Sequence, residues 1–173
     1  LQAPSVCNAL DTILIHEKQL NNLLPKIVSE LNKNGVQTRL DSRLYQSIKN
    51  ADSIKLIRKA NDKDWGKEFL DLIVSIKSVK SVDDAINHIN KYGTMHTDAI
   101  VTSKKSEAVL FVKNVKSSIA IHNSSTQFAD GEEFGFGGEV GISTNKIPPR
   151  GPVGLNELVT YKYEVYGSGQ IRK

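Results

Sequence analysis

The sequence predicts an α/β layered domain built around a parallel sheet. Short runs rich in β-branched residues alternate with segments whose apolar residues recur at helical spacing. This order of strands and helices is typical of parallel sheets with right-handed crossovers. The chain has 173 residues, of which 39% are hydrophobic and 24% charged, and this suits one globular domain with a core of its own.

The first part of the chain alternates strands and helices up to residue 58. "TILIH" is a β-branched run, and leucine, isoleucine and valine then recur at helical spacing until Asn34-Gly35, where glycine tolerates a left-handed helix end. Asp41 and Ser42 can cap a short helix that ends at Ile48. We therefore expect strands at 12–16, 36–40 and 54–58, and helices at 17–33 and 42–48.

The same alternation continues to residue 123. Ser81 is an N-cap candidate with Asp84 three positions later, and Gly93 marks the end of the helix that follows. We expect strands at 69–79, 98–102 and 118–123, and helices at 82–92 and 104–115.

The composition changes after Asn123. Residues 124–154 are rich in glycine, proline and serine, and this segment is too long for a simple connector. A short helix at 155–158 and a strand at 159–167 close the chain, with Tyr161, Tyr163 and Val165 at alternate positions of the strand. Because no later helix would cover this strand, we expect it to pair outside the main sheet.

Composition narrows the classes of partner and compartment. The net charge of +4 comes from scattered lysines without a dense run, which is typical of solvated surfaces rather than of a nucleic-acid site. No apolar run approaches the ~18–20 residues that span a bilayer, and the N-terminus lacks a signal-peptide pattern. A single cysteine fits a reducing cytosol, so we expect a cytoplasmic protein without nucleic-acid or membrane partners. Leu1 in place of an initiator methionine suggests a processed product or a fragment.

Cys7, the single cysteine, is the first candidate for chemistry. A lone cysteine is usually a small buried core residue. As a nucleophile it needs a lowered pKa, which backbone N–H groups at a turn can supply, and Pro4, Ser5 and Asn8 suit such a turn. Spacing alone leaves both roles open. A cysteine hydrolase with one of the four histidines is a third alternative, and no histidine pair has the i, i+4 spacing of a metal site.

Three other features of the sequence are candidates for ligand binding: the glycine loop, Arg150 and Glu68. The glycine loop at 135–141 departs from the dinucleotide-binding fingerprint because Val140 stands where the third glycine belongs. Its glycines favour close backbone approach to another domain or to a ligand. Arg150 lies on a stiff loop between prolines, where it can clamp a carboxylate or phosphate or make a structural salt bridge. Glu68, by pattern alone, is a solvated residue.

Five stretches together resemble a known family. They are "VCNALDTILIH", "FLDLIVSIKSVKSVDDAINHINKYG", "HTDAIVT", "FADGEEFGFGGEVGIST" and "RGPVGLNELVTYKYEVYGSGQIR". In this order they are similar to the C-terminal part of gamma-glutamyl phosphate reductase (glutamate-5-semialdehyde dehydrogenase), in the aldehyde dehydrogenase superfamily. The resemblance covers nearly the whole chain. It implies an aldehyde-dehydrogenase-like catalytic domain, a mostly parallel sheet with helices on both faces, followed by a C-terminal loop and a pairing strand.

The resemblance implies a reaction and its residues. In the family, a cysteine thiolate attacks L-glutamyl 5-phosphate, expels phosphate and forms a thioester, which hydride from NADPH reduces to L-glutamate 5-semialdehyde in proline biosynthesis. Cys7 matches this nucleophile, with an oxyanion site at the backbone beside it. The residues so implied are Cys7 and Asn8 for catalysis, Glu68 for the cofactor, and Asn123, Ser124, Ser125, Thr126 and Arg150 for the substrate, with no metal.

The resemblance also implies partners beyond this chain. NADP would be bound mostly by the family's N-terminal half, supplied in trans as a cofactor domain. We divide the chain into a catalytic α/β domain at 1–123, a glycine-rich loop and short helix at 124–157 that would pack on the cofactor domain, and an oligomerisation strand and tail at 158–173. That strand predicts a homo-oligomer.

Three departures from the family pattern bear on activity. The family usually has glutamate where Asp11 stands and often arginine where Gln127 stands, and loss of that cation would weaken the binding of an anionic substrate. Thr94-Met95 replaces the commoner Ser-Gly and places bulk beside His96. The alternative interpretation is an inactive remnant or assembly module of the family.

Overall fold

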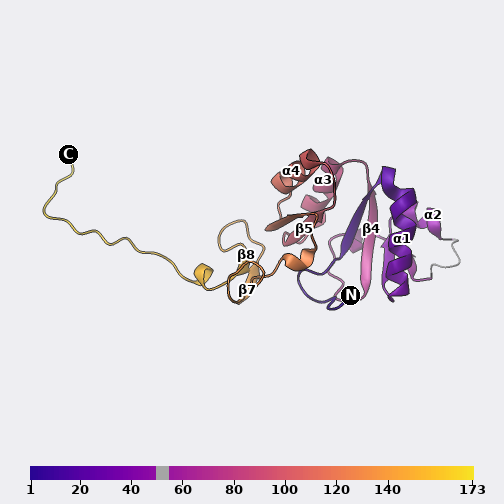
Figure 1. Ribbon diagram of the computed structural model, residues 1–173, viewed down its shortest axis with the longest axis horizontal. Coiled ribbons are helices and arrows are strands. Elements are labelled where there is room, and N and C mark those ends of the chain that lie inside the picture. Colours follow the sequence, from indigo (N-terminus) through magenta and orange to yellow (C-terminus); the bar gives the residue numbers. More distant parts are fainter. Residues whose placement is uncertain (50–54) are drawn as a thin grey trace.

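The computed structural model describes residues 1–49 and 55–173, and its body contains two parallel sheets (Figure 1). The larger sheet has four strands, in the order β1 (Thr12–His16), β4 (Ile73–Val79), β2 (Gln37–Leu40) and β3 (Ile57–Lys59). The smaller sheet pairs β5 (Thr97–Ile100) with β6 (Ile119–His122). All these neighbours run parallel. The predicted α/β fold with a parallel sheet is confirmed, with its strands divided between two sheets.

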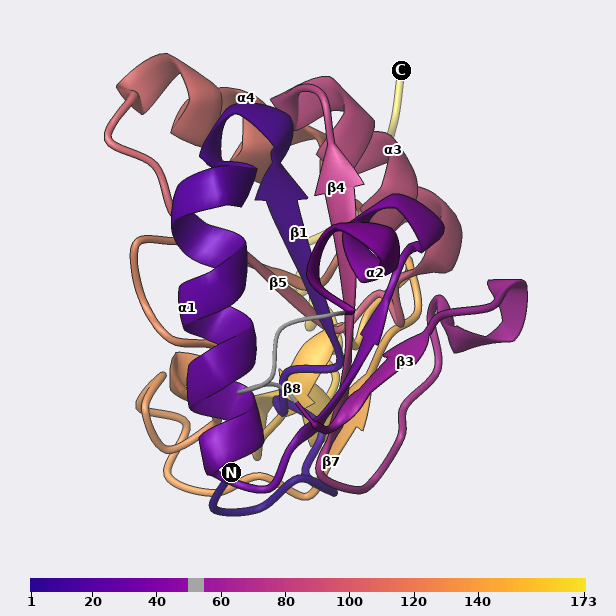
Figure 2. The same cartoon turned by 90° about the vertical axis from the view of Figure 1, so that its right-hand side faces the viewer.

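Two helices, α1 (Leu20–Lys33) and α2 (Ser42–Ile48), cover one face of the larger sheet (Figure 2). The core of this layer joins Val28 from α1, Leu44 from α2 and the strand residues Leu40 and Ile76, all buried. Burial of a side chain of this size contributes about 1.5–3 kcal/mol. Asp41 caps α2 as predicted, because its Oδ1 accepts a hydrogen bond from the Leu44 N–H at 2.9 Å.

The helix α3 (Val82–Tyr92) covers the opposite face of the larger sheet. Side chains alternate along a strand, so Lys77 points away from the core residue Ile76. The Nζ of Lys77 lies 3.2 Å from Nδ1 of His88 on α3. The His88 ring packs against Trp65 and Tyr92 at centroid distances of 5.6 and 4.8 Å. Helices therefore lie on both faces of this sheet, as predicted.

The smaller sheet is covered by α3 and α4 (Lys105–Asn114). Buried Ile86, Phe111 and Val115 form the contact between these helices and the sheet. Ser81 caps α3 as predicted, since its Oγ accepts a hydrogen bond from the Asp84 N–H at 3.1 Å. In the part of the chain that the structure describes, no helix is both long and apolar enough to cross a membrane.

Several element bounds differ from the prediction. The strand expected from residue 69 begins at Ile73, because Leu70 has a left-handed φ of 55° and the Phe69 N–H donates to Asp11 Oδ1 over 3.3 Å. The strand expected at 54–58 lies partly outside the described residues, and β3 begins at Ile57. Two stretches that were expected to be helical are 3-10 turns instead. They are η1 (Glu17–Gln19), ahead of α1, and η4 (Asn156–Leu158).

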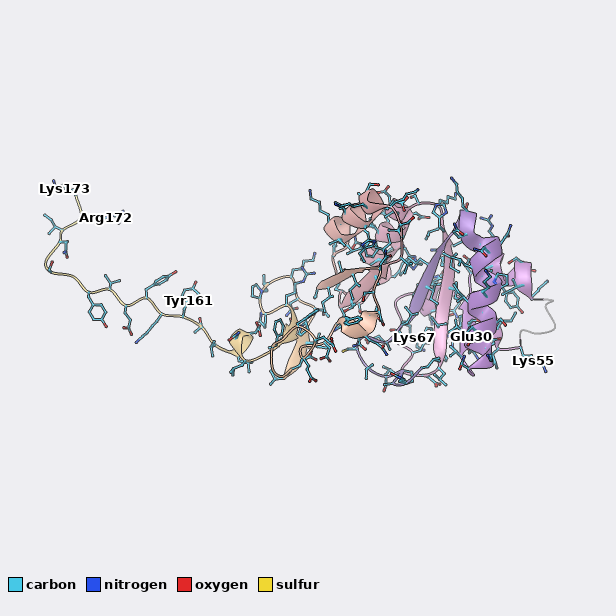
Figure 3. The ribbon with its side chains drawn as sticks, in the orientation of Figure 1. Glu30, Lys55, Lys67, Tyr161, Arg172 and Lys173 are labelled. Atoms are coloured by element: carbon cyan, nitrogen blue, oxygen red, sulfur yellow. The ribbon has the colours of Figure 1, made fainter. Side chains whose placement is uncertain are left out.

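The C-terminal segment differs most from the prediction. The expected loop at 124–154 contains β7 (Gly141–Ser143) and β8 (Gly151–Val153), which form an antiparallel hairpin. The strand expected at 159–167 is absent from the single chain, where these residues extend away from the body with Tyr161 exposed (Figures 1 and 3). A strand forms only where its backbone groups find partners, and among the described residues the tail has none to pair with. Pairing in an oligomer stays a prediction.

We predict that His88 makes the fold less stable in acid. Burial, and after it the charge of Lys77, lower the pKa of His88 from 6.5 to about 4. Above the unfolded pKa the imidazole is neutral in both states, whereas between the two pKa values only the unfolded state binds the proton. The free energy of unfolding should therefore fall by up to about 3 kcal/mol as the pH drops through this window.

Urea unfolding across that pH window, in the unaltered protein, His88→Gln and His122→Gln, checks this. The exposed His122 serves as the matched control. The pH dependence should be weaker in His88→Gln and unchanged in His122→Gln. Equal pH dependence in all three proteins would contradict the assignment.

Candidate functional site

Cys7 lies on an exposed turn ahead of β1. The Val6 N–H donates to the Ala3 carbonyl at 3.3 Å, and the Ala9 N–H donates to the Val6 carbonyl at 3.0 Å. These two bonds bracket Cys7 and present its side chain at the surface. The predicted turn is confirmed, and the alternative of a buried core cysteine is wrong.

A 3-10 turn, η3 (Thr126–Phe128), fixes the Cys7 turn from 118 residues further along the chain. Thr126 Oγ1 donates to the Asn8 carbonyl at 2.8 Å, and Asn8 Nδ2 donates to the Ala129 carbonyl at 3.3 Å. Ser125 caps η3, with its Oγ accepting a hydrogen bond from the Gln127 N–H at 3.2 Å. Three predicted site residues, Asn8, Ser125 and Thr126, therefore lie together beside Cys7.

The surroundings of Cys7 act on its pKa in opposite directions. Partial burial raises the pKa of the thiol most, and the negative charges of Glu139 and Asp130 raise it further. The backbone N–H groups of Cys7 and Asn8 favour the thiolate and lower the pKa. The net result is a pKa above the ordinary value, so in this chain the thiol is mostly protonated at neutral pH.

The side chain of Asn123 binds the backbone beyond the end of β5. Its Oδ1 accepts a hydrogen bond from the Thr102 N–H, and its Nδ2 donates to the Thr102 carbonyl, both at 2.9 Å. Asn123 has a φ of 54°, a left-handed conformation that asparagine tolerates better than most residues. In this arrangement Asn123 positions the loop that leads to η3, and direct substrate binding by its amide stays a prediction.

A groove of about 1650 Å³ carries most of the predicted site. It is lined by β1 of the larger sheet and by β5 of the smaller sheet. The predicted residues that line it are Cys7, Asn8, Asn123, Ser124, Ser125 and Thr126. Glu68 and Arg150 are not among the lining residues.

Glu68 is exposed on the loop before β4, close to Asp11. Burial raises the pKa of the Asp11 carboxyl, the Phe69 N–H lowers it, and the negative charge of Glu68 raises it again. An exposed carboxylate accepts hydrogen bonds from hydroxyl groups. The carboxylate of Glu68 therefore suits the ribose hydroxyls of a nicotinamide dinucleotide, and it is a single acceptor of a site that needs many more contacts.

Arg150 ties the β7–β8 hairpin to the smaller sheet. Its guanidinium donates a hydrogen bond to the backbone carbonyl of Lys116, between α4 and β6. This bond takes the place of the structural salt bridge that the sequence suggested, and the role of substrate clamp stays a prediction. Gln127 is exposed, with its Nε2 donating to Gln2 Oε1 at 3.4 Å.

Two residues that the sequence did not single out, Glu139 and His96, act on the same site. The charge of Glu139 acts on both Cys7 and His96. His96 is 4% exposed, with Nδ1 2.6 Å from Thr97 Oγ1, and its Nε2 has no hydrogen-bond partner among the described residues. Burial lowers the pKa of His96, while the carboxylates of Glu139 and Glu68 raise it. The one sequence feature that marks Glu139 is that it is the single glutamate inside the glycine loop "GFGGEVG".

No protein-family model matches the chain, but comparison with known proteins finds relatives that share one name. The chain is 48% identical over 175 residues to the gamma-glutamyl phosphate reductase of Clostridium tetani, and 51% identical over 169 residues to that of Clostridium beijerinckii. These matches cover 99% and 98% of the chain. Relatives named gamma-glutamyl phosphate reductase therefore match this chain over nearly its whole length.

The chain corresponds to a C-terminal portion of gamma-glutamyl phosphate reductase and spans 41% and 39% of those two relatives. The solved gamma-glutamyl phosphate reductase of Thermotoga maritima matches 99% of the chain with a TM-score of 0.92 and 44% identity, over 40% of its own length. The enzyme of Saccharomyces cerevisiae matches 94% of the chain with a TM-score of 0.56 and 27% identity, over 35% of its own length. An acetylating aldehyde dehydrogenase from Geobacillus thermoglucosidasius, 13% identical with a TM-score of 0.66, shares the fold.

We predict that Asn123 stabilises this part of the fold through both its φ and its hydrogen bonds. Asn123→Gly keeps the left-handed φ and loses the two bonds to Thr102, so it should cost about 1–2 kcal/mol of unfolding free energy. Asn123→Ala loses the same bonds and is also strained, so it should cost about 1 kcal/mol more.

Urea unfolding of both variants measures the difference. Ser124→Ala, at the exposed neighbouring position, is the control and should stay within about 0.5 kcal/mol of the unaltered protein. Equal losses in the glycine and alanine variants would contradict the role of φ, and no loss in either would contradict the role of the bonds.

Proposed function

We propose that this chain is the catalytic portion of an NADPH-dependent gamma-glutamyl phosphate reductase, which converts L-glutamyl 5-phosphate to L-glutamate 5-semialdehyde in proline biosynthesis. The observation that carries the proposal is the exposed Cys7 turn, which lines the groove and is held by the hydrogen bond from Thr126 to the Asn8 carbonyl. It occurs in a chain 48% and 51% identical to reductases of that name. We place this reductase in the cytoplasm, where its single cysteine stays reduced.

The covalent step would be carried by Cys7 and the backbone beside it. Once deprotonated, Sγ attacks the acyl carbon of the substrate, a carbon–sulfur bond forms, and phosphate leaves with the electron pair of the broken carbon–oxygen bond. The N–H groups of Cys7 and Asn8 already favour negative charge on the sulfur. Donors at this position suit the oxyanion that develops on the acyl oxygen before phosphate departs.

NADPH, when bound, would supply the hydride that converts the thioester to the semialdehyde and frees the thiol. On this chain, Glu68 would hold the cofactor by accepting hydrogen bonds from ribose hydroxyls. Most of the cofactor's binding surface would come from an N-terminal portion, because the chain spans 41% of its Clostridium tetani relative.

The substrate side would be formed by the loop that follows β6. Asn123 and Thr126 hold this loop through their bonds to Thr102 and Asn8, which leaves the hydroxyls of Ser124 and Ser125 for anionic oxygens of the substrate. Arg150 would add a bidentate clamp on the phosphate or a carboxylate after releasing the Lys116 carbonyl.

Two protein partners complete the proposal. An N-terminal cofactor domain would cover the groove and pack on residues 124–157. A second copy would pair with residues 158–173, which extend away from the body (Figure 3). In this segment Tyr163 and Val165 are 84% and 89% exposed. Exposed apolar side chains at alternate positions suit strand addition to a partner.

An inactive remnant or assembly module is the second candidate. It is favoured by the raised pKa of Cys7 in this chain, because a protonated thiol is a poor nucleophile. The two candidates differ in whether Cys7 matters when the N-terminal portion is supplied.

We predict that adding the N-terminal portion of a gamma-glutamyl phosphate reductase restores turnover. Oxidation of NADPH coupled to phosphate release from L-glutamyl 5-phosphate should appear in the mixture and be absent with either part alone. Cys7→Ser should reduce this rate by roughly a thousandfold or more, because it removes the nucleophile. Ser5→Ala, on the same stretch ahead of β1, is the control and should keep the rate.

Robust turnover by the chain alone would contradict the division of the cofactor site between two portions. If a folded mixture fails to oxidise NADPH, or if Cys7→Ser retains the rate, the reductase proposal is wrong and the remnant is favoured.

A further inference from the structure

The groove that carries the Cys7 turn lies between the open edges of the two parallel sheets. Among the residues that the structure describes, β1 pairs with β4 alone and β5 pairs with β6 alone. Every residue of β1 and of β5 lines the groove. Cys7 and Asn8 precede β1, so the stretch between the two strands is separate from the turn of the proposed nucleophile.

The backbone of β1 presents hydrogen-bonding groups to this groove. The Asp11 carbonyl accepts a hydrogen bond from the Ser75 N–H of β4 at 2.9 Å. Backbone groups alternate in direction along a strand, so the N–H and C=O groups of Thr12 and Leu14 point away from β4 and toward the groove.

The backbone of β5 does the same from the other side. The Ile100 carbonyl accepts a hydrogen bond from the Asn123 N–H, just beyond β6, at 2.9 Å. The N–H and C=O groups of Thr97 and Ala99 therefore point away from β6 and toward the groove. In the described part of the chain, no ladder uses the groups at either edge, and unpaired strand edges of this kind are templates for a further strand.

Helices enclose the groove on both faces. Leu23 and Ile27 of α1 line it, as do Ile89 and Tyr92 of α3. Since α1 and α3 cover opposite faces of the larger sheet, a strand in the groove would be buried on both faces. Parallel strands buried in this way are near-continuous apolar runs. The groove therefore suits an extended segment that is apolar on both faces.

The helix α3 links the two sheets and indicates the direction of such a strand. It follows β4, places Ile86 in the cluster against which Ile100 and Ala120 of the smaller sheet pack, and leads into β5. A connection of strand, helix and strand is typical of parallel strands in one sheet. β1 and a further parallel strand would then fill the positions between β4 and β5.

The tail of this chain is a poor occupant of the groove. Tyr161, Tyr163 and Val165 alternate there with Lys162 and Glu164. In the groove one face of the tail would bury both charges, and the desolvation of even a paired lysine and glutamate is costly. The tail suits a sheet edge with one face in solvent. This favours an occupant from outside the chain, which spans 41% of its Clostridium tetani relative.

We propose that the groove receives an extended apolar segment of the N-terminal portion of the reductase, which pairs in parallel with β1 and β5 and joins the two sheets into one. Four or five residues suffice, since β5 has four and β1 has five. The inference rests on the proposed function for the identity of the partner and on the open edges for the site. The N-terminal portion is then part of the catalytic sheet as well as the carrier of the cofactor.

Amide hydrogen exchange tests this on the full chain, alone and mixed with the N-terminal portion of the Clostridium tetani reductase. The amides of Thr12, Leu14, Thr97 and Ala99 should exchange at least tenfold more slowly in the mixture, because each gains a buried hydrogen bond. The amides of β3, at the far edge of the larger sheet, should exchange at an unchanged rate.

A pair of proline variants tests the pairing itself. Ala99→Pro removes an N–H that faces the groove and keeps the ladder to β6, since proline is tolerated at a sheet edge. It should weaken binding of the N-terminal portion about tenfold or more, because a carbonyl of the entering strand is left buried without a donor.

Lys59→Pro is the matched control for Ala99→Pro. The Ala60 N–H donates to the Leu40 carbonyl of β2 at 2.7 Å, so the neighbouring Lys59 N–H points out from the opposite sheet edge. Lys59→Pro should therefore bind the N-terminal portion as the unaltered chain does. Isothermal titration calorimetry measures the affinities, and circular dichroism checks that both variants keep the fold.

The outcomes separate this inference from the proposed function. Protection of β1 and β5 in a mixture that fails to oxidise NADPH would support the strand and contradict the catalysis. Turnover without protection of the two edges would overturn the inference, and so would a mixture whose portions do not bind or whose affinity is the same in Ala99→Pro and Lys59→Pro. Protection already present in the chain alone and lost in Val165→Pro would also overturn it, by assigning the groove to the tail of a second copy.

Discussion

The hydrogen bond from the Thr126 hydroxyl to the Asn8 carbonyl is the contact on which the rest of the site depends. It joins positions 118 residues apart and sets the Cys7 turn against η3. A neutral hydrogen bond of this kind contributes only about 1 kcal/mol to stability, so its importance lies in position. Once the turn is fixed, the side-chain amide of Asn8 donates a hydrogen bond to the Ala129 carbonyl. Two residues later, the Gly131 N–H donates to the carboxylate of Glu139.

The parallel sheets determine where this contact can form. β1 and β4 are parallel neighbours, so the segments before them, with Cys7 and Glu68, lie at the same edge of the larger sheet. β5 and β6 are also parallel, and the residues beyond both strands, Thr102 and Asn123, meet at the carboxyl edge of the smaller sheet. The loop from Asn123 then reaches the Cys7 turn. The site therefore forms where the amino edge of one sheet approaches a loop from the carboxyl edge of the other.

Most of the fold could be predicted from the sequence because its signals are local. The caps Asp41 and Ser81 and the apolar periodicity of α1 and α3 lie within a few residues of the elements that they define. The hairpin β7–β8 was missed because its strands are short and surrounded by glycine and proline. The strand expected at 159–167 did not form because its backbone finds no strand to pair with among the described residues, and local alternation cannot supply one.

The site was predictable only in part, for the same physical reason. Spacing left Cys7 undecided between a core residue and a nucleophile, and only resemblance over nearly the whole chain favoured the second. The hydrogen bonds of Asn123 to Thr102 and of Thr126 to Asn8 arise from contacts between distant segments. His96 shows the same limit, since its buried Nε2 follows from how β5 and the preceding loop are enclosed.

The central claim, that Thr126 fixes the Cys7 turn, is tested most directly by amide hydrogen exchange in Thr126→Val. The account predicts that the Ala9 amide, which closes the turn on Val6, exchanges about fivefold faster, equivalent to about 1 kcal/mol. In Thr126→Val the amides of β4 should exchange at an unchanged rate. In Thr160→Val, a control on the tail, the Ala9 amide should also be unchanged. Unaltered exchange at Ala9 in Thr126→Val would contradict the claim, and so would a loss of protection throughout β4, which would assign Thr126 to the fold as a whole.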